Sequence, residues 1–145
     1  MMKFEILWNE AQHTKDGTLY RIYALRDIPQ HNVKAGDRGG WIAGGFNLCQ
    51  VGDAWVADDA KVFDYAQVFG DALVSGDAQL HDYVLVHGNA HVFGSAQVHD
   101  SARVFDRAHV FGKAWVTGEA WVFEDARVFG NAHVCGKLRV CDVRR

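Results

Sequence analysis

The sequence has almost no proline, the residue that stiffens loops, and no apolar segment long enough to cross a membrane. Its 145 residues include a single proline, Pro29. Hydrophobic runs all stop well short of the ~18 residues of a membrane span. The opening residues, MMKFEILWNE, lack the charged and then apolar layout of a signal peptide. These absences predict a cytoplasmic protein without a membrane partner.

Cysteine is also scarce, and its spacing excludes two common uses. The three residues, Cys49, Cys135 and Cys141, are an odd number and form no CxxC pair. We therefore expect neither a disulfide framework nor a zinc site, but reduced thiols. A phosphate-cradling GxxxxGK(S/T) loop is missing as well, so the sequence indicates no cofactor.

Positive charge is nearly missing from the middle of the chain. Residues 52–100 hold one Lys or Arg against eight Asp or Glu, a net charge of −7. Residues 1–51 have six against five, or +1, and residues 101–145 have eight against five, or +3, which together give the −3 of the chain. An acidic centre argues against contact with phosphates, so we expect no nucleic-acid partner.

What the sequence does contain is a six-residue unit repeated without insertion. Of the fifteen positions spaced by six from residue 54 to residue 138, thirteen are Ala, and fourteen of the fifteen from residue 56 to residue 140 are Val. Every sixth residue from Gly52 to Asp142 is Gly or Asp, except Glu124. The unit is therefore Ala-x-Val-x-(Gly/Asp)-x, and such self-similarity decides the fold class.

Each unit fits one short strand followed by one corner. Ala and Val are two residues apart, so their side chains point to the same side of a strand. Glycine adopts positive φ freely, and Asp tolerates it while bonding to nearby backbone, which suits the corner. A helix is excluded because a period of six does not keep Ala and Val on one face of a 3.6-residue spiral. Three units per turn would give about five coils stacked about 4.8 Å apart.

The unit resembles that of the hexapeptide-repeat, or left-handed β-helix, superfamily. The run Gly130-Asn131-Ala132-His133-Val134 carries the N-A-x-V-x-G-N variant, which occurs in acyltransferase-like proteins and in uncharacterised bacterial and prophage proteins. The resemblance implies an all-β, triangular parallel β-helix of left-handed winding over residues 52–145. In the acyltransferases the turn residue follows the aliphatic residue directly, whereas here one residue intervenes, as in Val92-Phe93-Gly94.

Residues 1–51 predict a cap and an entry segment. Lys3–Trp8 and Thr18–Ile28 are strand candidates around a turn at Lys15-Asp16-Gly17, which together indicate a β-hairpin. A cap is needed because the first coil would otherwise expose unpaired backbone and an apolar end. Residues 33–42 are similar to the entry segment that precedes such solenoids in prophage-type proteins.

Large aromatic residues recur at outward positions of the repeat. Residues 18 apart should stack, so the sequence gives one ladder of Phe93, Phe111 and Phe129, a second of Phe69, Phe105 and Phe123 that His87 interrupts, and neighbouring outward Trp115 and Trp121. Stacked rings stabilise a parallel sheet on their own, but a contiguous apolar patch normally marks an interface. We predict that these eight residues form an interface for self-association. The resemblance favours a parallel trimer, ahead of the antiparallel dimer that the −7 and +3 segments would suit.

Two histidines offer the only pattern that suits a metal. His81 and His99 are 18 residues apart, each is followed by an aspartate, Asp82 or Asp100, and Asp64 lies one coil earlier. Imidazole and carboxylate are metal ligands, but the corner already accounts for the aspartates, so we assign no metal site.

The expected function is a non-enzymatic binding module of phage or prophage type, which binds itself and an unidentified protein in a bacterial or infected cell. One alternative is a hexapeptide-repeat acyltransferase, which by resemblance would use a histidine base and coenzyme A. The unbroken hexads provide no loop to enclose an acyl donor. The other alternative is an inhibitor of a host defence enzyme, by analogy with small acidic phage proteins. No catalytic or cofactor-binding residue is assigned.

Overall fold

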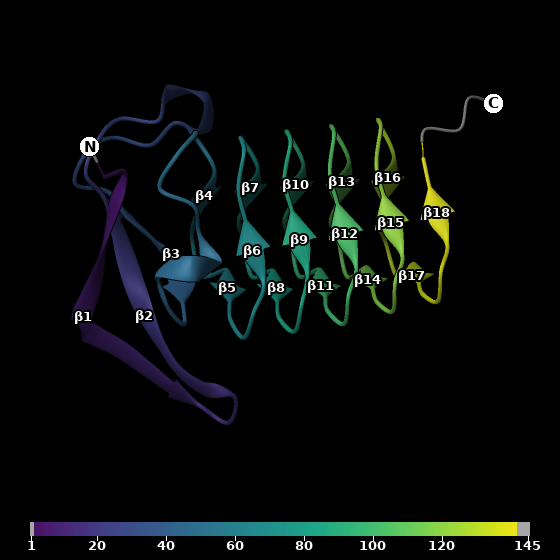
Figure 1. The fold of residues 1–145 in the computed structure, drawn as a ribbon, viewed down its shortest axis with the longest axis horizontal. Helices are drawn as coiled ribbons and strands as arrows, with labels where there is room; N and C mark the ends of the chain where they lie inside the picture. Colours follow the sequence, from purple (N-terminus) through teal and green to yellow (C-terminus); the bar gives the residue numbers. More distant parts are fainter. Residues whose placement is uncertain (1, 142–145) are drawn as a thin grey trace.

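The computed structural model describes residues 2–141 as a row of stacked coils with a hairpin at one end (Figure 1). The protein is an all-β parallel solenoid of about six turns with an N-terminal antiparallel hairpin, which confirms the predicted fold class. Within residues 2–141 no helix is long and apolar enough to cross a membrane. The corner expected at Asp142 lies outside the described residues.

The hairpin consists of β1 (Phe4–Thr14) and β2 (Gly17–Ala24). Its turn lies where the sequence predicts it, since Thr14 pairs with Gly17. The first strand runs further than expected because the register shifts between Leu7 and Ala11, and this bulge lets the ladder continue to the turn. Two short 3₁₀ helices follow, η1 (Pro29–His31) and η2 (Gly45–Asn47).

Fifteen two-residue strands form the coils, and they sort into three parallel sheets, which we name by their central strands. The β10 sheet holds β4 (Trp55–Val56), β7 (Leu73–Val74), β10 (His91–Val92), β13 (His109–Val110) and β16 (Arg127–Val128). The β11 sheet holds β5 (Lys61–Val62), β8 (Gln79–Leu80), β11 (Gln97–Val98), β14 (Trp115–Val116) and β17 (His133–Val134). The β12 sheet holds β6 (Gln67–Val68), β9 (Leu85–Val86), β12 (Arg103–Val104), β15 (Trp121–Val122) and β18 (Arg139–Val140).

The entry segment already pairs as part of a coil. Strand β3 (Arg38–Ile42) is antiparallel to β2 on one side, and on the other it pairs in parallel with β5, with Ile42 opposite Val62. A single bridge joins Leu48 to Val68 in the same sense. The solenoid therefore has about one turn more than the five that the hexads alone predict.

The interior of the coils is built from the repeated Ala and Val. Every one of these side chains from Ala54 to Val122 is fully buried, including the substituted Leu80 and Val84. At the corners the Gly and Asp residues adopt positive φ, as at Gly112 (69°) and Asp82 (61°). A Cβ at Gly112 would lie 2.8 Å from the backbone nitrogen of Gly130 in the next coil, so the corner leaves little room for an ordinary side chain.

A buried lysine ties the hairpin to the first coil. Lys3 is fully buried, and its Nζ donates to the carbonyl oxygen of Ala54 at 2.6 Å. Burial lowers the pKa of Lys3 to about 8, with the charge of Arg26 acting in the same direction. The side-chain oxygen of Gln50 accepts the backbone N–H groups of Lys3 and Phe4 at 2.7 and 3.1 Å. The apolar end of the solenoid is thus covered by a segment that is itself fixed by hydrogen bonds.

The narrow interior gives a stability prediction. Ala108 is fully buried, so Ala108→Leu should overpack its coil and lower the free energy of unfolding by about 1–3 kcal/mol. Gln97→Leu places the same side chain on the outward side of β11 and should change the free energy by less than about 0.5 kcal/mol. Chemical denaturation of both variants measures the difference, and equal effects would contradict the inward assignment of Ala108.

Candidate interaction surface

The first predicted ladder lies on the β10 sheet, one residue after the inward Val. Phe93 and Phe111 stack with ring centroids 4.8 Å apart and an interplanar angle of 2°, and Phe111 and Phe129 stack at 5.4 Å and 13°. His109, on the neighbouring strand position, meets Phe93 edge-on at 6.1 Å. The 18-residue register therefore brings these three phenylalanines together as the sequence predicts.

The second ladder occupies the same position on the β12 sheet. Here the histidine does not interrupt the stack, because His87 lies parallel to Phe69 at 4.7 Å and to Phe105 at 5.2 Å. Phe105 and Phe123 continue it at 5.3 Å. Burial between these rings lowers the pKa of His87, and the nearby Arg103 lowers it further. A neutral imidazole thus serves as one more flat ring in the stack.

The two tryptophans lie on different sheets. Trp121 is on β15, edge-on to Phe105 at 5.6 Å, with the guanidinium groups of Arg103 and Arg139 over its ring at 5.6 and 4.4 Å. Trp115 is on β14, edge-on to His99 and His133. Trp121 thus lies beside the second ladder on the β12 sheet and contacts its Phe105, whereas Trp115 belongs to the β11 sheet.

Stacking leaves less of this surface exposed than eight isolated rings would offer. Only Trp115 and Phe129, at 44% and 56%, are exposed; the other six side chains are partly covered, since each ring hides the face of the next. What the ladders present to solvent is mainly rows of ring edges. This arrangement suits contact with a flat partner surface.

A third aromatic row was not among the predicted residues. Tyr65 and Tyr83 stack at 5.3 Å and 6°, and Phe46 of η2 lies 6.3 Å from Tyr65. These side chains are 55–63% exposed, more than most of the predicted ladder. The 18-residue spacing of the two tyrosines carried the signal, but they follow the corner residue and not the inward Val.

The histidines and aspartates considered for a metal lie together on the β11 sheet side. His81 and His99 stack at 4.9 Å, and His99 Nδ1 lies 3.2 Å from Asp100 Oδ1 and 3.9 Å from Asp82 Oδ2. One coil earlier His81 Nδ1 has the same relation to Asp82 and Asp64. In each group the ligand atoms lie within 4.8 Å of one another, which is compatible with holding a cation.

These aspartates already have a structural role. The Asp64 carboxylate accepts the backbone N–H of Asp82 at 3.1 Å, Asp82 accepts that of Asp100 at 2.9 Å, and Asp100 accepts that of Gly118 at 2.9 Å. The hydrogen bond from the Gly118 N–H is the main cause of the lowered pKa of Asp100, and the hydrogen bond with His99 lowers that pKa further. Each aspartate thus lies at a corner, as the sequence predicts, and also links that corner to the next coil.

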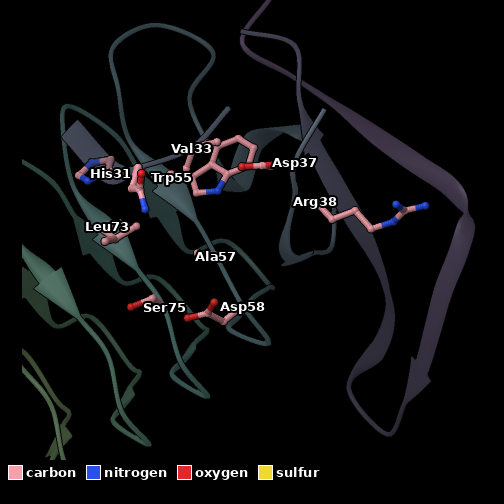
Figure 2. Close-up of a pocket in the computed structure, with 10 residues that line it drawn as sticks. His31, Val33, Asp37, Arg38, Trp55, Ala57, Asp58, Leu73 and Ser75 are labelled. Carbon is pink, nitrogen blue, oxygen red and sulfur yellow. The ribbon is translucent and has the colours of Figure 1, made fainter. Parts of the chain in front are cut away.

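Two clefts lie where the N-terminal segment meets the first coils. One, of about 470 Å³, is bounded by the loop after η1 and by β4 and β7 (Figure 2). The other, of about 380 Å³, lies between η2 and β6 and reaches Phe69, the first ring of the second ladder. Neither is enclosed by a loop that leaves the coils, because within residues 55–140 every strand follows the previous one after six residues.

A further histidine from the entry segment joins the β10 sheet. His31 Nε2 lies 2.9 Å from the carbonyl oxygen of Asp71, and its ring meets His91 edge-on at 6.0 Å. Its Nδ1 is buried and has no hydrogen-bond partner among the described residues. Burial lowers the pKa of both His31 and His91. Protonation of His31 would place an unpaired N–H in the interior, so the neutral ring fits this position.

Because the pKa of His87 is lowered, we predict that replacing His87 with phenylalanine stabilises the fold more at acidic pH than at alkaline pH. Because the folded pKa lies below the unfolded value of about 6.5, the unfolded chain binds more protons, and wild-type stability falls as pH drops through that value. His87→Phe removes this loss while keeping the stack. We expect it to raise the melting temperature more at about pH 5.5 than at about pH 8. An equal gain at both pH values, measured by circular dichroism, would contradict burial of a neutral His87.

Comparison with known proteins supports the presence of a β-solenoid repeat in this chain. Residues 66–82 match the family model of the YdcK beta solenoid repeat. This span runs from the inward Ala66 of one coil to the corner at Asp82, just under one 18-residue turn. No curated protein matches the chain. The match and the stacked coils agree, and the chain is a β-solenoid repeat protein.

Proposed function

We propose that the protein is a non-enzymatic binding module, a rigid solenoid that associates with itself and with a protein partner through its stacked aromatic rows. The observation that carries the proposal is the continuity of the rings. Phe93, Phe111 and Phe129 form one uninterrupted stack, and the row from Phe69 to Phe123 forms another. Contiguous apolar rows on a surface normally mark a contact site.

The two rows border the same sheet, which favours one continuous contact. The first row follows the strands of the β10 sheet, and the second follows those of the β12 sheet just before the chain turns into the β10 sheet. Leu73, His91 and His109 lie between them on the outward side of the β10 strands. A flat face with rings along both borders offers a broad area to a second flat face.

We assign the scaffold to the hexapeptide-repeat superfamily, and the resemblance to that superfamily implies left-handed winding. Six-residue units, three sheets and a positive φ at each described corner are what that superfamily's coils require. A parallel trimer is the assembly proposed on this basis, ahead of an antiparallel dimer. The resemblance of residues 33–42 to prophage-type entry segments supports a role in phage or prophage biology, and we propose that the protein acts in the cytoplasm of a bacterial or infected cell.

Self-association is tested by light scattering at micromolar concentration. The wild type should have a mass of about three times the 16.2 kDa of one chain. The triple change Phe93→Ser/Phe111→Ser/Phe129→Ser removes the first row and should give a monomer, since burial of the rings drives the contact. Circular dichroism checks that this variant keeps its strands.

A matched control uses the other exposed stack. Tyr65→Ser/Tyr83→Ser removes two stacked rings that lie outside the predicted interface and should leave the mass unchanged. A monomeric wild type would refute the interface. An oligomer that survives the Phe change but not the Tyr change would move the contact to the row of Phe46, Tyr65 and Tyr83.

Acyl transfer remains the second candidate, and ligand binding separates it from a binding module. An acyltransferase has to hold a coenzyme A thioester beside a histidine base. The described coils run without excursion, and residues 52–100 carry the −7 charge, which opposes the phosphates of coenzyme A. Calorimetry should detect no acetyl-coenzyme A binding at about 1 mM, which corresponds to only about −4 kcal/mol. Micromolar binding that a single histidine substitution abolishes would establish the acyltransferase instead.

A further inference from the structure

The outward position after each inward Val carries a ring over most of the solenoid, and the exceptions near the hairpin fall on one sheet. A Phe or His stands there after three strands of the β10 sheet, three of the β11 sheet and four of the β12 sheet. In the two coils next to the hairpin, only β4 and β7 are followed by a small residue, Ala57 and Ser75. The Phe93 row of the β10 sheet is thus two rings short at its hairpin end.

The cleft of about 470 Å³ lies where these two rings are missing. It is lined on the solenoid side by Ala57, Leu73 and Ser75, and on the other side by Val33 and Asp37 of the loop after η1 (Figure 2). The volume is within the ~300–1,000 Å³ of small-molecule sites. The hollow is therefore a gap in a ladder, closed in by the entry segment.

The ladder beside the gap offers one ring face to an occupant. Ser75 precedes Phe93 by one coil, and its N–H donates to the carbonyl oxygen of Val92 at 2.9 Å. Phe111 covers one face of Phe93 in a nearly parallel stack. The other face is directed toward the coil that carries Ser75, where the row has no further ring. A planar ring placed over Ser75 would continue the stack at a spacing of about 5 Å.

The cleft is also negatively charged. Asp58 follows Ala57 directly and its Oδ2 accepts the N–H of Gly76, the residue after Ser75, at 2.9 Å. Asp37 lines the opposite side. The one cation of the lining, Arg38, is paired with Glu10 of the hairpin at 2.6 Å, and Figure 2 shows its side chain extending away from the cleft. Arg21 donates to the backbone carbonyl oxygen of Asp58 at 3.1 Å, but it also pairs with Asp59 at 3.8 Å and does not line the cleft. The two carboxylates are therefore the charges of the lining that can act on an occupant.

We propose that this cleft binds a small planar aromatic cation. Its ring continues the Phe93 row over Ser75, and its positive group pairs with Asp58 in the field of Asp37. Aromatic stacking and a charge-assisted hydrogen bond act together at one site, which distinguishes such a ligand from an aromatic acid or an aliphatic amine. The proposal does not rest on self-association: Phe93 also belongs to the predicted interface, but Asp58, Asp37 and the other residues that line the cleft do not.

The test is an NMR titration of the isotope-labelled full chain with benzamidine, a planar aromatic cation. We expect the amide resonances of Ala57, Ser75 and Gly76 to shift, with a dissociation constant of about 1 mM or below. Benzoate has the same ring with the opposite charge, and guanidinium has the charge without the ring. Both should bind at least about tenfold more weakly.

Two variants separate the site from a general surface effect. Ser75→Phe fills the gap with a ring and should abolish benzamidine binding without lowering the melting temperature. Ser101→Phe places the same side chain in the row of Tyr65 and Tyr83, away from the cleft, and should leave the affinity unchanged. Asp58→Asn keeps an acceptor for the Gly76 N–H but removes the charge, and should weaken binding at least about fivefold.

The outcomes that overturn the proposal are distinct. Benzamidine shifts that survive Ser75→Phe would place the binding elsewhere, and benzoate bound as tightly as benzamidine would refute the charge recognition. If Ser75→Phe fails to fold, Asp58→Asn decides, and an unchanged affinity there contradicts the proposal. Asp58→Asn leaves all eight predicted interface residues in place, so its mass by light scattering reports on the interface alone, and the fate of the interface and of the cleft can be told apart.

Discussion

The packing of Ala and Val inside coils of 18 residues is the constraint on which the rest of the structure depends. A strand of two residues cannot hold its partner alone, so each coil must stay in register with the next through backbone hydrogen bonds such as Gln97 N–H to Ala114 oxygen, at 2.9 Å. The inward positions of the repeat hold no side chain larger than Leu, which keeps the three sheets close enough to share one core. An insertion of one residue would turn inward side chains outward and break this register.

Register is also what converts sequence spacing into rows of like side chains. Residues 18 apart lie one above the other, so phenylalanines stack on phenylalanines and His87 is accepted between two of them as a neutral ring. The same rule would bring aspartates together at the corners, where like charges repel. Asp64, Asp82 and Asp100 are tolerated there because each carboxylate accepts a backbone N–H from the coil above and lies near a histidine ring.

The hairpin end is where the repeat meets irregular structure, and both described clefts lie there. Lys3, Gln50 and Asn47 bind the entry segment to the first coils; the Asn47 side chain alone accepts the N–H of Ala43 and donates to the carbonyl oxygen of Ala66. Small residues at Ala57 and Ser75 leave space under this segment where the other sheets carry rings. The uniform coils build flat faces, and the two clefts described above lie where the cap departs from the repeat.

The sequence by itself determined the repeat, the inward Ala and Val, the corners and the composition of the two Phe rows, because a strict period of six leaves one way to bury a side chain at every unit. It also located the hairpin turn, since Lys15-Asp16-Gly17 separates two apolar strands. Only the tertiary structure decided the extra turn at Ile42 and Leu48, the covering of ring faces within each stack and the cleft beside Ser75. These depend on contacts between the entry segment and the coils, such as His31 with Asp71, that join residues 40 apart without any shared period. Tyr65 and Tyr83 belong to both cases: their spacing is in the sequence, but their exposure is set by the corner on which they lie.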